Sequence, residues 1–478
     1  MNFNELNLSE DILKALNNLG YKKPSEVQEA SIPRLLNGED VVIKSQTGSG
    51  KTASFGIPVC EKIDIEEKKV QCLVLTPTRE LAIQVKDELS NIGRLKKVRC
   101  TAIFGKQPFN EQVRELKQRV HVVVGTPGRV FDHMERGTLD LSGVNYVVID
   151  EADKMLSMGF IDQIKDILGE LRLNKTTALF SATFPKEIEE VCEEYMRNPV
   201  SLEIKSKVFN RDRISESVIE IEEKNKSKAL WKCLYAYHPE SAIVFCNTRN
   251  KVKSVYKMLK EEGITCNELH GDMDQKKRIE VMENFRDKHF KVLVCTDIAA
   301  RGIHVDSIEL VINYEVPMEM ESYVHRIGRT GRAGKDGKAI TFSNHYEKKF
   351  LEAVEEYIGY EIKKASLPSE EEVKSGRKIF KDDQRLKQKE SRKPKKEVHS
   401  DIVKIHINGG KKKKIRAFDI VGCFSHLEGL TGDDIGIIDV QDGFSYVDIL
   451  NGKGNSILRK FKEVKIKGKV VKIQRAKK

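Results

Sequence analysis

An apolar run, VVIK at 41–44, leads directly into the glycine-rich segment SQTGSGKT at 45–52, and a helical pattern follows. A strand, a glycine-rich turn ending in Lys-Thr and a helix together surround a phosphate with backbone N–H groups. Lys51 would then reach the β- and γ-phosphates, and Thr52 would hold Mg²⁺. Ser45 stands where the general pattern has its first glycine. This feature predicts an α/β domain that binds a nucleotide.

Short β-branched runs alternate with longer helical patterns over the first 360 residues. Apolar strands that alternate with helices form parallel sheets covered on both faces. The runs form two sets, so we expect two α/β domains, residues 1–208 and 209–365, joined near 205–215. The first set is 41–44, 72–76, 122–126, 146–150 and 177–183, with a helix over 79–91. The second set is 242–246, 292–296, 310–315 and 338–342, with a helix over 251–262.

The chain changes character after residue 365. Residues 366–400 are polar and highly charged, and we interpret them as a flexible or partly helical linker. Residues 401–478 show the order βαββαβ, which is that of the ferredoxin-like fold and of RNA-recognition domains. The expected elements are strand 402–408, helix 416–427, strands 435–440 and 444–450, helix 455–464 and strand 469–475.

The positive charge lies in the C-terminal quarter of the chain. The formal net charge is +11. Residues 363–400 contribute +6 (13 Lys and Arg against 7 Asp and Glu) and residues 401–478 contribute +8 (17 against 9), so residues 1–362 sum to −3. Localised basic charge predicts a polyanionic partner, nucleic acid first. An acidic membrane surface is the alternative, but no basic amphipathic helix supports it.

The sequence also bears on location. Its apolar runs fall far short of the ~18 residues that span a bilayer. The N-terminal residues show no basic region followed by an apolar one, so we expect no membrane span and no export. The nine cysteines are at least 12 positions apart, without the spacing of a metal site, and fit reduced thiols of a cytoplasmic protein.

A second strand-like run, YVVID at 146–150, ends in the sequence Asp150-Glu151-Ala152-Asp153. A carboxylate at a strand end near a phosphate loop organises Mg²⁺, and Asp150 is placed for that role. A second carboxylate beside it, that of Glu151, can position and deprotonate an attacking water. These residues predict hydrolysis of the bound nucleotide.

Further motifs follow in a fixed order along the chain. Together with DEAD at 150–153, they resemble the motifs of the DEAD-box RNA helicases, and the match covers roughly residues 3–345. The motifs are Phe3 with GYKKPSEVQ (20–28), PTREL (77–81), TPGR (126–129), SAT (181–183), VFCNT (244–248), HGDMDQKKR (270–278), TDIAARGI (296–303) and HRIGRTGR (325–332).

The resemblance implies two RecA-like domains with ATP and Mg²⁺ as cofactors and with RNA bound across both. It implies catalytic roles for Lys51, Asp150, Glu151, Arg329 and Arg332, the two arginines acting as fingers on the phosphates. Thr52 and Asp150 would hold Mg²⁺, partly through water. The implied ATP-binding residues are Tyr21, Gln28, Ser45, Gln46, Thr47, Gly48, Ser49, Gly50, Lys51 and Thr52, with Gln28 reading adenine. The residues implied to couple ATP to RNA are Asp153, Ser181, Thr183 and His325.

The resemblance also implies which residues contact RNA. These contacts grip sugar and phosphate, so the two-domain core alone is expected to be blind to sequence. The residues are Pro77, Thr78, Arg79, Gly105, Thr126, Arg129, Arg249 and Thr296. Two positions depart from the family: Lys106 replaces a frequent glycine, and His304 replaces the usual aspartate. Either His304 weakens ATP affinity or coupling, or Asp306 compensates for it.

The tail resembles the C-terminal domain of the DbpA/YxiN subgroup in NGGKKKKIRA (408–417), DDIGII (433–438) and YVDILNGKG (446–454). The resemblance implies an RNA-recognition-like (RRM-like) domain that binds a hairpin of large-subunit ribosomal RNA. The protein would then act on pre-ribosomal particles during assembly of the large subunit, as a cytoplasmic monomer.

The residues of the tail allow more than one interpretation. A basic loop of Lys411, Lys412, Lys413, Lys414 and Arg416 is expected to grip phosphates, although a merely solvated turn has the same composition. RNA-recognition sheets stack bases on aromatic side chains of their first and third strands. Here Phe444 and Tyr446, with His406 opposite, either stack on bases or fill the core.

Two other functions fit parts of the sequence. A non-catalytic RNA clamp with a vestigial ATP site is kept open by His304, although Lys51, Glu151, Arg329 and Arg332 argue against it. A translocating DNA helicase is the other, and Gln28 with the DEAD sequence favours the RNA-unwinding group instead. An ATP-dependent RNA helicase is therefore the leading expectation.

Overall fold

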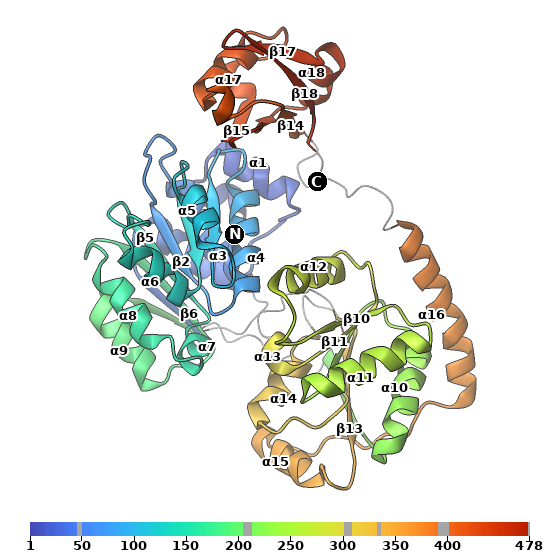
Figure 1. The fold of residues 1–478 in the computed structure, drawn as a ribbon. Coiled ribbons are helices and arrows are strands. Elements are labelled where there is room, and N and C mark those ends of the chain that lie inside the picture. The colour runs from blue at the N-terminus through green and yellow to red at the C-terminus, as the bar shows by residue number, and fades with distance from the viewer. Residues whose placement is uncertain (45–49, 204–212, 301–307, 332–335, 391–400, 477–478) are drawn as a thin grey trace. The chain divides into compact units, whose positions relative to one another are not determined.

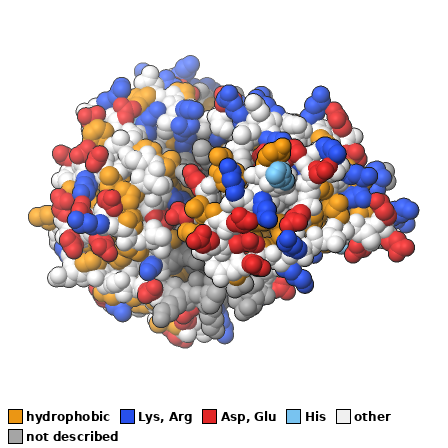
Figure 2. All heavy atoms as spheres, turned by 90° about the horizontal axis from the view of Figure 1, so that it is seen from below, with side chains coloured by type: hydrophobic (Ala, Val, Ile, Leu, Met, Phe, Trp, Pro, Cys, Tyr) orange, Lys and Arg blue, Asp and Glu red, His pale blue; other side chains and the backbone are white. Residues whose placement is uncertain are grey.

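The structure is a computed structural model of the 478-residue chain, and it describes residues 1–44, 50–203, 213–300, 308–331, 336–390 and 401–476. It divides into two compact units, one of residues 1–204 with 395–478 and the other of residues 205–394. No helix within the described ranges is long and apolar enough to cross a membrane. Figure 2 shows acidic and basic side chains interspersed over one face.

The first unit contains a parallel sheet with the strand order β3-β4-β2-β5-β6-β1-β7 among the described residues. Its strands are β1 (Val41–Lys44), β2 (Cys72–Leu75), β3 (Cys100–Ile103), β4 (Val122–Gly125), β5 (Tyr146–Asp150), β6 (Thr176–Ser181) and β7 (Val200–Glu203). The helices are η1 (Phe3–Glu5), α1 (Glu10–Asn18), α2 (Glu26–Leu36), α3 (Lys51–Lys62), α4 (Arg79–Ile92), α5 (Phe109–Leu116), α6 (Pro127–Glu135), α7 (Ala152–Ser157), α8 (Ile161–Gly169) and α9 (Lys186–Tyr195).

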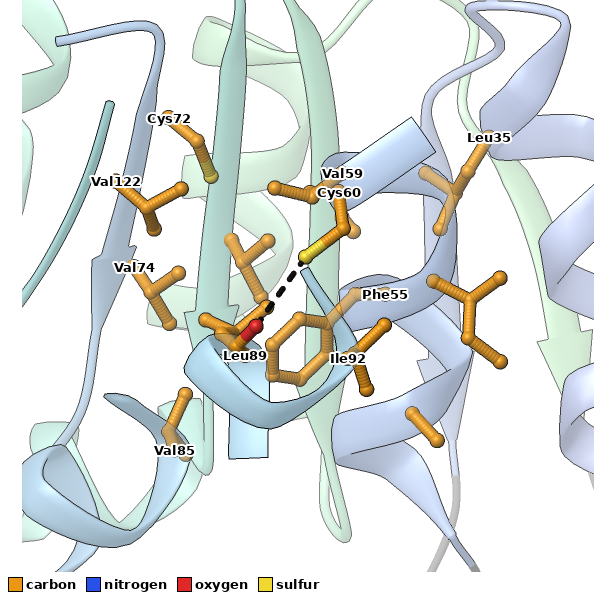
Figure 3. Packing of buried hydrophobic residues seen from close by; sticks show 14 of the residues in the cluster. Leu35, Phe55, Val59, Cys60, Cys72, Val74, Val85, Leu89, Ile92 and Val122 are labelled. Atoms are coloured by element: carbon orange, nitrogen blue, oxygen red, sulfur yellow. Dashed lines mark hydrogen bonds between the residues drawn. The ribbon is translucent and has the colours of Figure 1, made fainter. Parts of the chain in front are cut away.

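Helices cover both faces of this sheet (Figure 1). Successive strand residues point to opposite faces, so Ile43 packs with α3 and α4, whereas Val42 packs with α6 and α8. Figure 3 shows the first of these clusters, with Phe55 of α3 and Leu89 of α4 beside the strand residues. The Cys60 thiol donates a hydrogen bond to the Leu89 carbonyl (3.5 Å), and burial raises its pKa well above the usual value.

The second unit has a parallel sheet with the order β10-β11-β9-β12-β13-β8 in its described part. Its strands are β8 (Ile214–Glu220), β9 (Ala242–Phe245), β10 (Cys266–Leu269), β11 (Val292–Cys295), β12 (Leu310–Asn313) and β13 (Gly337–Ser343). The helices are α10 (Glu223–Tyr237), α11 (Arg249–Glu261), α12 (Gln275–Arg286), α13 (Asp297–Ala300), α14 (Met320–Ile327), α15 (Lys348–Ile358) and α16 (Glu370–Glu390).

Helix α16 lies within the segment that we interpreted as a flexible or partly helical linker, and it runs along α10 (Figure 1). Val373 and Phe380 are buried in the core cluster that α10 helps to form. Phe380 meets the ring of Tyr235 edge-on at 5.6 Å. Gly376 marks the closest approach, because a Cβ there would lie 2.1 Å from the Tyr235 carbonyl oxygen. The helix is thus part of the second unit.

The C-terminal module, residues 401–476, is an antiparallel sheet with the order β15-β16-β14-β18-β17. Its elements are β14 (Val403–Ile407), η3 (Lys411–Lys413), α17 (Ala417–Ser425), η4 (Gly432–Asp434), β15 (Ile435–Val440), β16 (Ser445–Ile449), α18 (Gly454–Lys460), β17 (Glu463–Ile466) and β18 (Lys469–Arg475). Without β17 this is the ferredoxin-like order. The predicted fold class, two parallel α/β domains followed by an α+β module, is confirmed.

The C-terminal end predicted for the second helix of the module is wrong. The helix expected over 455–464 ends at Lys460, and the next residues form β17, which pairs with β18. Val464 and Ile466 are buried while the residues beside them are exposed. This alternation is that of a half-buried strand.

The sequence also failed to reveal four strands of the parallel sheets. They are β3, β7, β8 and β10, which are the outermost strands of the two sheets in the described part of the chain. An edge strand is less enclosed than a central one and carries polar residues, as Ser201 and Glu203 of β7 do. The central strands are buried on both faces and therefore show continuous apolar runs.

Within the first unit, the C-terminal module contacts α1 and the end of α4. The Arg94 guanidinium donates a hydrogen bond to the Asp448 carboxylate at 2.9 Å, and the Lys14 ammonium lies 3.7 Å from Asp401. A small apolar cluster joins the same surfaces and consists of Ala15, Leu95, Ile402 and Leu450.

We expect Gly376→Ala to displace α16 from α10, because the added methyl group would overlap the Tyr235 carbonyl. Overpacking of this kind costs ~1–3 kcal/mol. Hydrogen exchange of the α16 amides should become faster, and thermal unfolding of the unit should shift to lower temperature. Ser375→Ala, an exposed change on the same helix, is the matched control. Equal protection of α16 in both variants would contradict this packing.

Candidate functional site

The predicted site residues of the first unit gather at the edge where its parallel strands end. Strands β1, β6 and β5 are neighbours, so the phosphate loop, Ser181 and Asp150 follow adjacent strands. Strands β2, β4 and β3 are neighbours as well, so Thr78, Thr126 and Gly105 lie together. Parallel α/β sheets bind ligands at this edge. The expected ATP residues therefore follow β1, β5 and β6 in one half of this edge, and the expected RNA residues follow β2, β3 and β4 in the other half.

Part of the predicted site lies outside the described residues: Ser45, Gln46, Thr47, Gly48, Ser49, His304, Asp306 and Arg332. The end of the phosphate loop is described. Gly50 has φ +86°, and a Cβ there would lie 2.8 Å from Gln28 Nε2. The Gln28 amide donates to the Gly50 carbonyl at 3.1 Å, and its oxygen accepts the Ser25 N–H at 3.0 Å. Helix α2 thereby holds the end of the loop.

Tyr21, which precedes α2, contacts η1 and α4. Its ring meets Phe3 edge-on at 6.2 Å, and its hydroxyl donates to Glu88 of α4 at 3.0 Å. These contacts join the segment before α2 to the helices on that face of the sheet.

Lys51 and the acidic residues at the end of β5 form a buried charged group. Burial lowers the pKa of Lys51, and the charges of Asp150, Glu151 and Asp153 partly oppose that shift. Burial, and then the charge of Glu151, raise the pKa of Asp150 to about 7. Two neighbouring carboxylates in a buried site need positive charge to remain ionised, and Lys51 supplies part of it.

The site fits a divalent cation. The Oδ1 atom of Asp150 is buried and has no hydrogen-bond partner within the described part of the chain. Carboxylate and hydroxyl oxygens are the ligands that Mg²⁺ prefers, and it keeps several waters in nucleotide sites. Asp150 and the hydroxyl of Thr52, at the start of α3, are the groups that would hold it. The cation would neutralise charge on the phosphates.

Glu151 adopts a conformation that is uncommon for a residue other than glycine. Its φ is +57°, in the left-handed region, and it precedes the first residue of α7. Its carboxylate is buried and pairs with the Lys154 ammonium at 2.7 Å. Such backbone strain persists where the surrounding structure fixes it, often at functional sites. Strand β5 thus ends at Asp150, and α7 begins immediately after Glu151.

The predicted coupling residues of the first unit are in direct contact. The Asp153 N–H donates to Ser181 Oγ at 3.2 Å, and the Asp153 carboxylate accepts the Ala182 N–H at 3.3 Å. The Ser181 hydroxyl donates to the Thr183 carbonyl at 2.6 Å. These bonds tie the start of α7 to the end of β6. Movement of the acidic segment would therefore reach the segment at 181–183.

The RNA half of the edge uses helix N-termini. Thr78, which follows the buried Pro77, caps α4 by accepting the Leu81 N–H at 3.2 Å. Arg79 begins the helix, and a Cβ on Gly105 would meet its guanidinium at 3.4 Å. Helix N-termini carry free N–H groups and bind phosphate. The structure therefore brings Thr78, Arg79 and Gly105 together as expected for a backbone-gripping site.

The second unit repeats this arrangement. Thr248 caps α11 by accepting the Lys251 N–H at 3.2 Å, and Arg249 begins the helix. The Arg249 guanidinium pairs at 2.6 Å with the carboxylate of Asp272, which follows strand β10. The Thr296 N–H donates to the Leu269 carbonyl at 3.3 Å, so it lies at the same edge. Equivalent strand ends thus carry equivalent residue types in both units.

The guanidinium of Arg129, another predicted RNA contact, has several partners within the protein. It donates to the Gln107 carbonyl at 3.2 Å and to Gln112 Oε1 at 3.0 Å. It also lies 3.6 Å from Asp132. Arg129 holds the segment after Gly105 against α6, next to Thr126, which precedes that helix.

Arg326 is a site residue that the sequence reasoning missed. It is buried, and its guanidinium makes paired hydrogen bonds to Asp297 at 2.6 Å each. It also donates to Asn247 Oδ1 at 2.8 Å and to the Glu315 carbonyl at 2.9 Å. The signal was present, because Arg326 lies inside HRIGRTGR and Asp297 follows a predicted strand. Arg326 joins the ends of β9, β11 and β12 to α14.

Two predicted site residues, His325 and Arg329, lie close to Arg326 in the sequence, on α14 and just after it. His325 is exposed on α14. Arg329 is buried, and its Nε–H donates to the His325 carbonyl at 3.1 Å. The backbone of α14 thus positions the expected arginine finger.

The basic loop of the C-terminal module is held by backbone contacts. Gly410 packs against the β15–β16 turn, where a Cβ would lie 2.1 Å from the Gln441 carbonyl oxygen. The N–H groups of Lys411 and Lys412 donate to the Gln441 and Asp442 carbonyls, at 2.8 Å each. Lys411, Lys412, Lys414 and Arg416 are exposed, while Lys413 is half-buried and donates to Asn408. The loop presents its ammonium groups from a fixed backbone.

Phe444 and Tyr446 lie outside the core of the module. Phe444 is 37% exposed, and neither ring belongs to the buried cluster of the module. Both meet His406 with ring centroids 5.5 Å apart. Of the two roles that the sequence allowed, filling the core is excluded.

Comparisons with known proteins agree with this arrangement. Three family models match in order: DEAD/DEAH box helicase over residues 25–191, helicase conserved C-terminal domain over 225–334, and DbpA RNA binding domain over 404–475. ATP-dependent RNA helicase DbpA of Bacillus subtilis is 49% identical over 476 residues, which cover 100% of this chain and 99% of that protein. DEAD-box ATP-dependent RNA helicase CshA of Geobacillus kaustophilus is 42% identical over 374 residues, 78% of this chain and 80% of that protein.

Solved structures extend the comparison to bound states. S. cerevisiae Dbp5 bound to RNA and ADP BeF3 has a TM-score of 0.69 at 32% identity, over 80% of this chain and 99% of that chain. Mss116p bound to ssRNA and AMP-PNP has a TM-score of 0.67 at 29% identity, over 79% of this chain and 81% of that chain. The resemblance expected from the motifs is confirmed. The chain therefore belongs to the DbpA subgroup of the DEAD-box ATP-dependent RNA helicases, RNA-stimulated ATPases that use ATP with Mg²⁺.

Proposed function

We propose that this helicase remodels large-subunit ribosomal RNA during assembly of the large ribosomal subunit, and that its C-terminal module directs it to a hairpin in that RNA. The observation that carries the proposal is the folded module with its fixed basic loop, which follows a helicase core. It would act on pre-ribosomal particles in the cytoplasm, as a monomer. We divide the chain into residues 1–208, 209–365, 366–400 and 401–478, with the two RecA-like domains first and the RNA-binding module last.

For the ATP site, we propose that Gln28 and Tyr21 take part in adenine binding, while residues 45–52 bind the phosphates. Glu151 orients and deprotonates the attacking water, whose new bond to the γ-phosphorus replaces the bond to the β–γ bridging oxygen. Arg329 and Arg332 stabilise the charge that develops on the phosphates. Support comes from the buried Lys51–Asp150–Glu151 group and from the buried, hydrogen-bonded Arg329.

For RNA, we propose that the helix N-termini after β2, β4 and β9 grip the backbone without reading bases. Coupling passes from Asp153 to Ser181 and Thr183 and, in the second domain, involves His325. The decisive experiment compares ATPase stimulation by large-subunit ribosomal RNA, by its hairpins and by DNA. Equal stimulation by DNA and ribosomal RNA would contradict the proposal.

Glu151→Gln should leave ATP and RNA binding intact and lower turnover at least 100-fold, the scale of a lost general base. The amide keeps the size of the side chain but cannot accept the proton. ATP hydrolysis in the presence of RNA is the measurement, with thermal unfolding as a check because Lys154 loses its partner. Glu170→Gln, an exposed change at the end of α8, is the control. Normal hydrolysis by the Glu151 variant would remove the proposed role.

A chain that ends at Glu390 should keep RNA-stimulated ATPase activity but lose its preference among RNAs. This end point retains α16, so Phe380 stays in the core cluster of the second unit and the residues around it remain buried. The measurement is stimulation by ribosomal RNA and by an unstructured RNA, each compared with the full chain. If the shortened enzyme still prefers ribosomal RNA, selectivity does not reside in the C-terminal module.

Replacing Lys411 to Lys414 together with alanine should reduce the salt dependence of RNA binding by the full chain. Each phosphate contact adds ~0.7 to the slope of log affinity against log salt, so the loss should be at most about 3. Affinity should fall more at low salt than at high salt. Tyr446→Ala is the contrast, because removal of an uncharged ring leaves the number of phosphate contacts, and therefore the slope, unchanged. Unchanged affinity and slope in the lysine variant would mean that the loop is only a solvated turn.

A further inference from the structure

Phe418 is an exposed aromatic residue near the start of α17 in the C-terminal module. Its side chain is 82% exposed, although the larger apolar residues later in this helix, Ile420, Val421, Cys423 and Phe424, pack into or against the core of the module. Gly422, one turn later, offers no side chain to cover the ring. Within the described part of the chain, Phe418 has no aromatic or cationic neighbour of the kinds found for Phe444 and Tyr446. The fold gains little from a phenylalanine at this position.

The surroundings of Phe418 are strongly basic. Lys414 and Arg416 precede it and are exposed. The turn between β17 and β18 brings further ammonium groups, because Lys467 donates to the Lys414 carbonyl at 3.3 Å and Lys469 to the Lys413 carbonyl at 2.8 Å. An exposed ring beside clustered cations matches the chemistry of unpaired nucleotides, which have a π face and a phosphate.

The acid next to Phe418 does not cancel this charge. Asp419 accepts the Arg416 N–H at 2.9 Å and lies 3.8 Å from the Lys467 ammonium. Its carboxylate is therefore engaged in capping α17 and in pairing with the turn. The basic edge, defined here as Lys411–Lys414, Arg416, Lys467 and Lys469, keeps a positive field around the ring.

The sheet face of the same module is a weaker candidate for stacking. There His406, Phe444 and Tyr446 already contact one another, with Phe444 and Tyr446 at 5.3 Å. Asp439 of β15 lies directly opposite Tyr446 in the sheet, and its negative charge disfavours phosphate there. Phe418, in contrast, has no such ring neighbour within the described part of the chain, and the Asp419 carboxylate beside it is already engaged with Arg416 and Lys467.

We propose that Phe418 stacks on an unpaired base of the RNA whose phosphates are held by the basic edge, and that it contributes to the choice of RNA. This inference rests on the proposed RNA binding by the C-terminal module. Single-stranded loops present unstacked bases, which RNA-binding proteins hold against aromatic side chains. The stacked base and the gripped phosphates together would favour a hairpin loop over continuous duplex.

Phe418→Ala in the full chain should weaken binding of fragmented large-subunit ribosomal RNA about 5- to 150-fold, which corresponds to ~1–3 kcal/mol per stacked base. The slope of log affinity against log salt should stay unchanged, in contrast to the variant that lacks Lys411 to Lys414. Phe418→Tyr should retain affinity. Tyr346→Ala, which removes a ring that is 79% exposed in the second unit, is the matched control and should have no effect.

A spectroscopic test separates stacking from charge. The chain has one tryptophan, Trp231 in α10, so the full chain is the reference for the F418W variant. Ribosomal RNA should quench the additional fluorescence of F418W. Heparin, a polyanion without bases, should bind the basic edge without quenching it.

The outcomes distinguish this inference from the proposed function. If the lysine variant loses affinity while Phe418→Ala does not, the module binds RNA but the inference is overturned. If neither variant changes affinity, RNA binding by this edge fails as well. If Phe418→Ala weakens association with pre-ribosomal particles but not with naked RNA, the ring contacts a protein, which also overturns the inference.

Discussion

Parallel pairing of buried strands is the constraint on which the rest of this structure depends. Parallel strands end at the same edge of a sheet, and the two sheets lie under helices on both faces. Residues that are far apart in sequence, such as Asp150 at the end of β5 and Ser181 at the end of β6, are therefore brought to the same edge. The same rule places Thr78 and Thr248 before equivalent helices of the two units. Chemistry at these sites is thus a property of strand order, and the loops need only supply the correct side chains.

The ATP site combines this geometry with strain and burial that a stable fold would otherwise avoid. Glu151 has a left-handed backbone, and the buried Asp150 carboxylate has an oxygen without a partner in the described part of the chain. Each feature costs stability when the site stands alone. A divalent cation and a triphosphate would relieve the electrostatic cost, so ligand binding can organise the acidic segment. Asp153 then connects that segment to Ser181 through hydrogen bonds. Through these bonds a change in the acidic segment would reach the end of β6.

Most of the fold and much of the candidate site could be predicted from the sequence, and the exceptions have physical causes. Central strands are buried on both faces and appear as apolar runs, whereas the edge strands β3, β7, β8 and β10 carry polar residues. Strand β17 was not recognised because it has only four residues and begins just after α18. Its alternation of exposed residues with the buried Val464 and Ile466 was therefore predicted as the end of that helix. Charge composition predicted a linker before residue 400, but two apolar residues, Val373 and Phe380, suffice to dock α16. Single residues were harder to predict. Arg129 was expected to contact RNA and Arg326 was not singled out, but both guanidinium groups bind protein partners that only the folded chain brings together.

The distribution of charge explains why two RNA-binding surfaces are useful in one enzyme. Residues 1–362 carry a net charge of −3, and the two segments after them carry +6 and +8. Affinity that depends on counterion release is strong, fast to form and indifferent to sequence. With the contacts proposed above, the near-neutral core would hold RNA at helix N-termini, where the strength of a contact depends on geometry. Selectivity would then have to come from contacts that are not purely electrostatic, and the stacking proposed for Phe418 beside the basic edge would supply one.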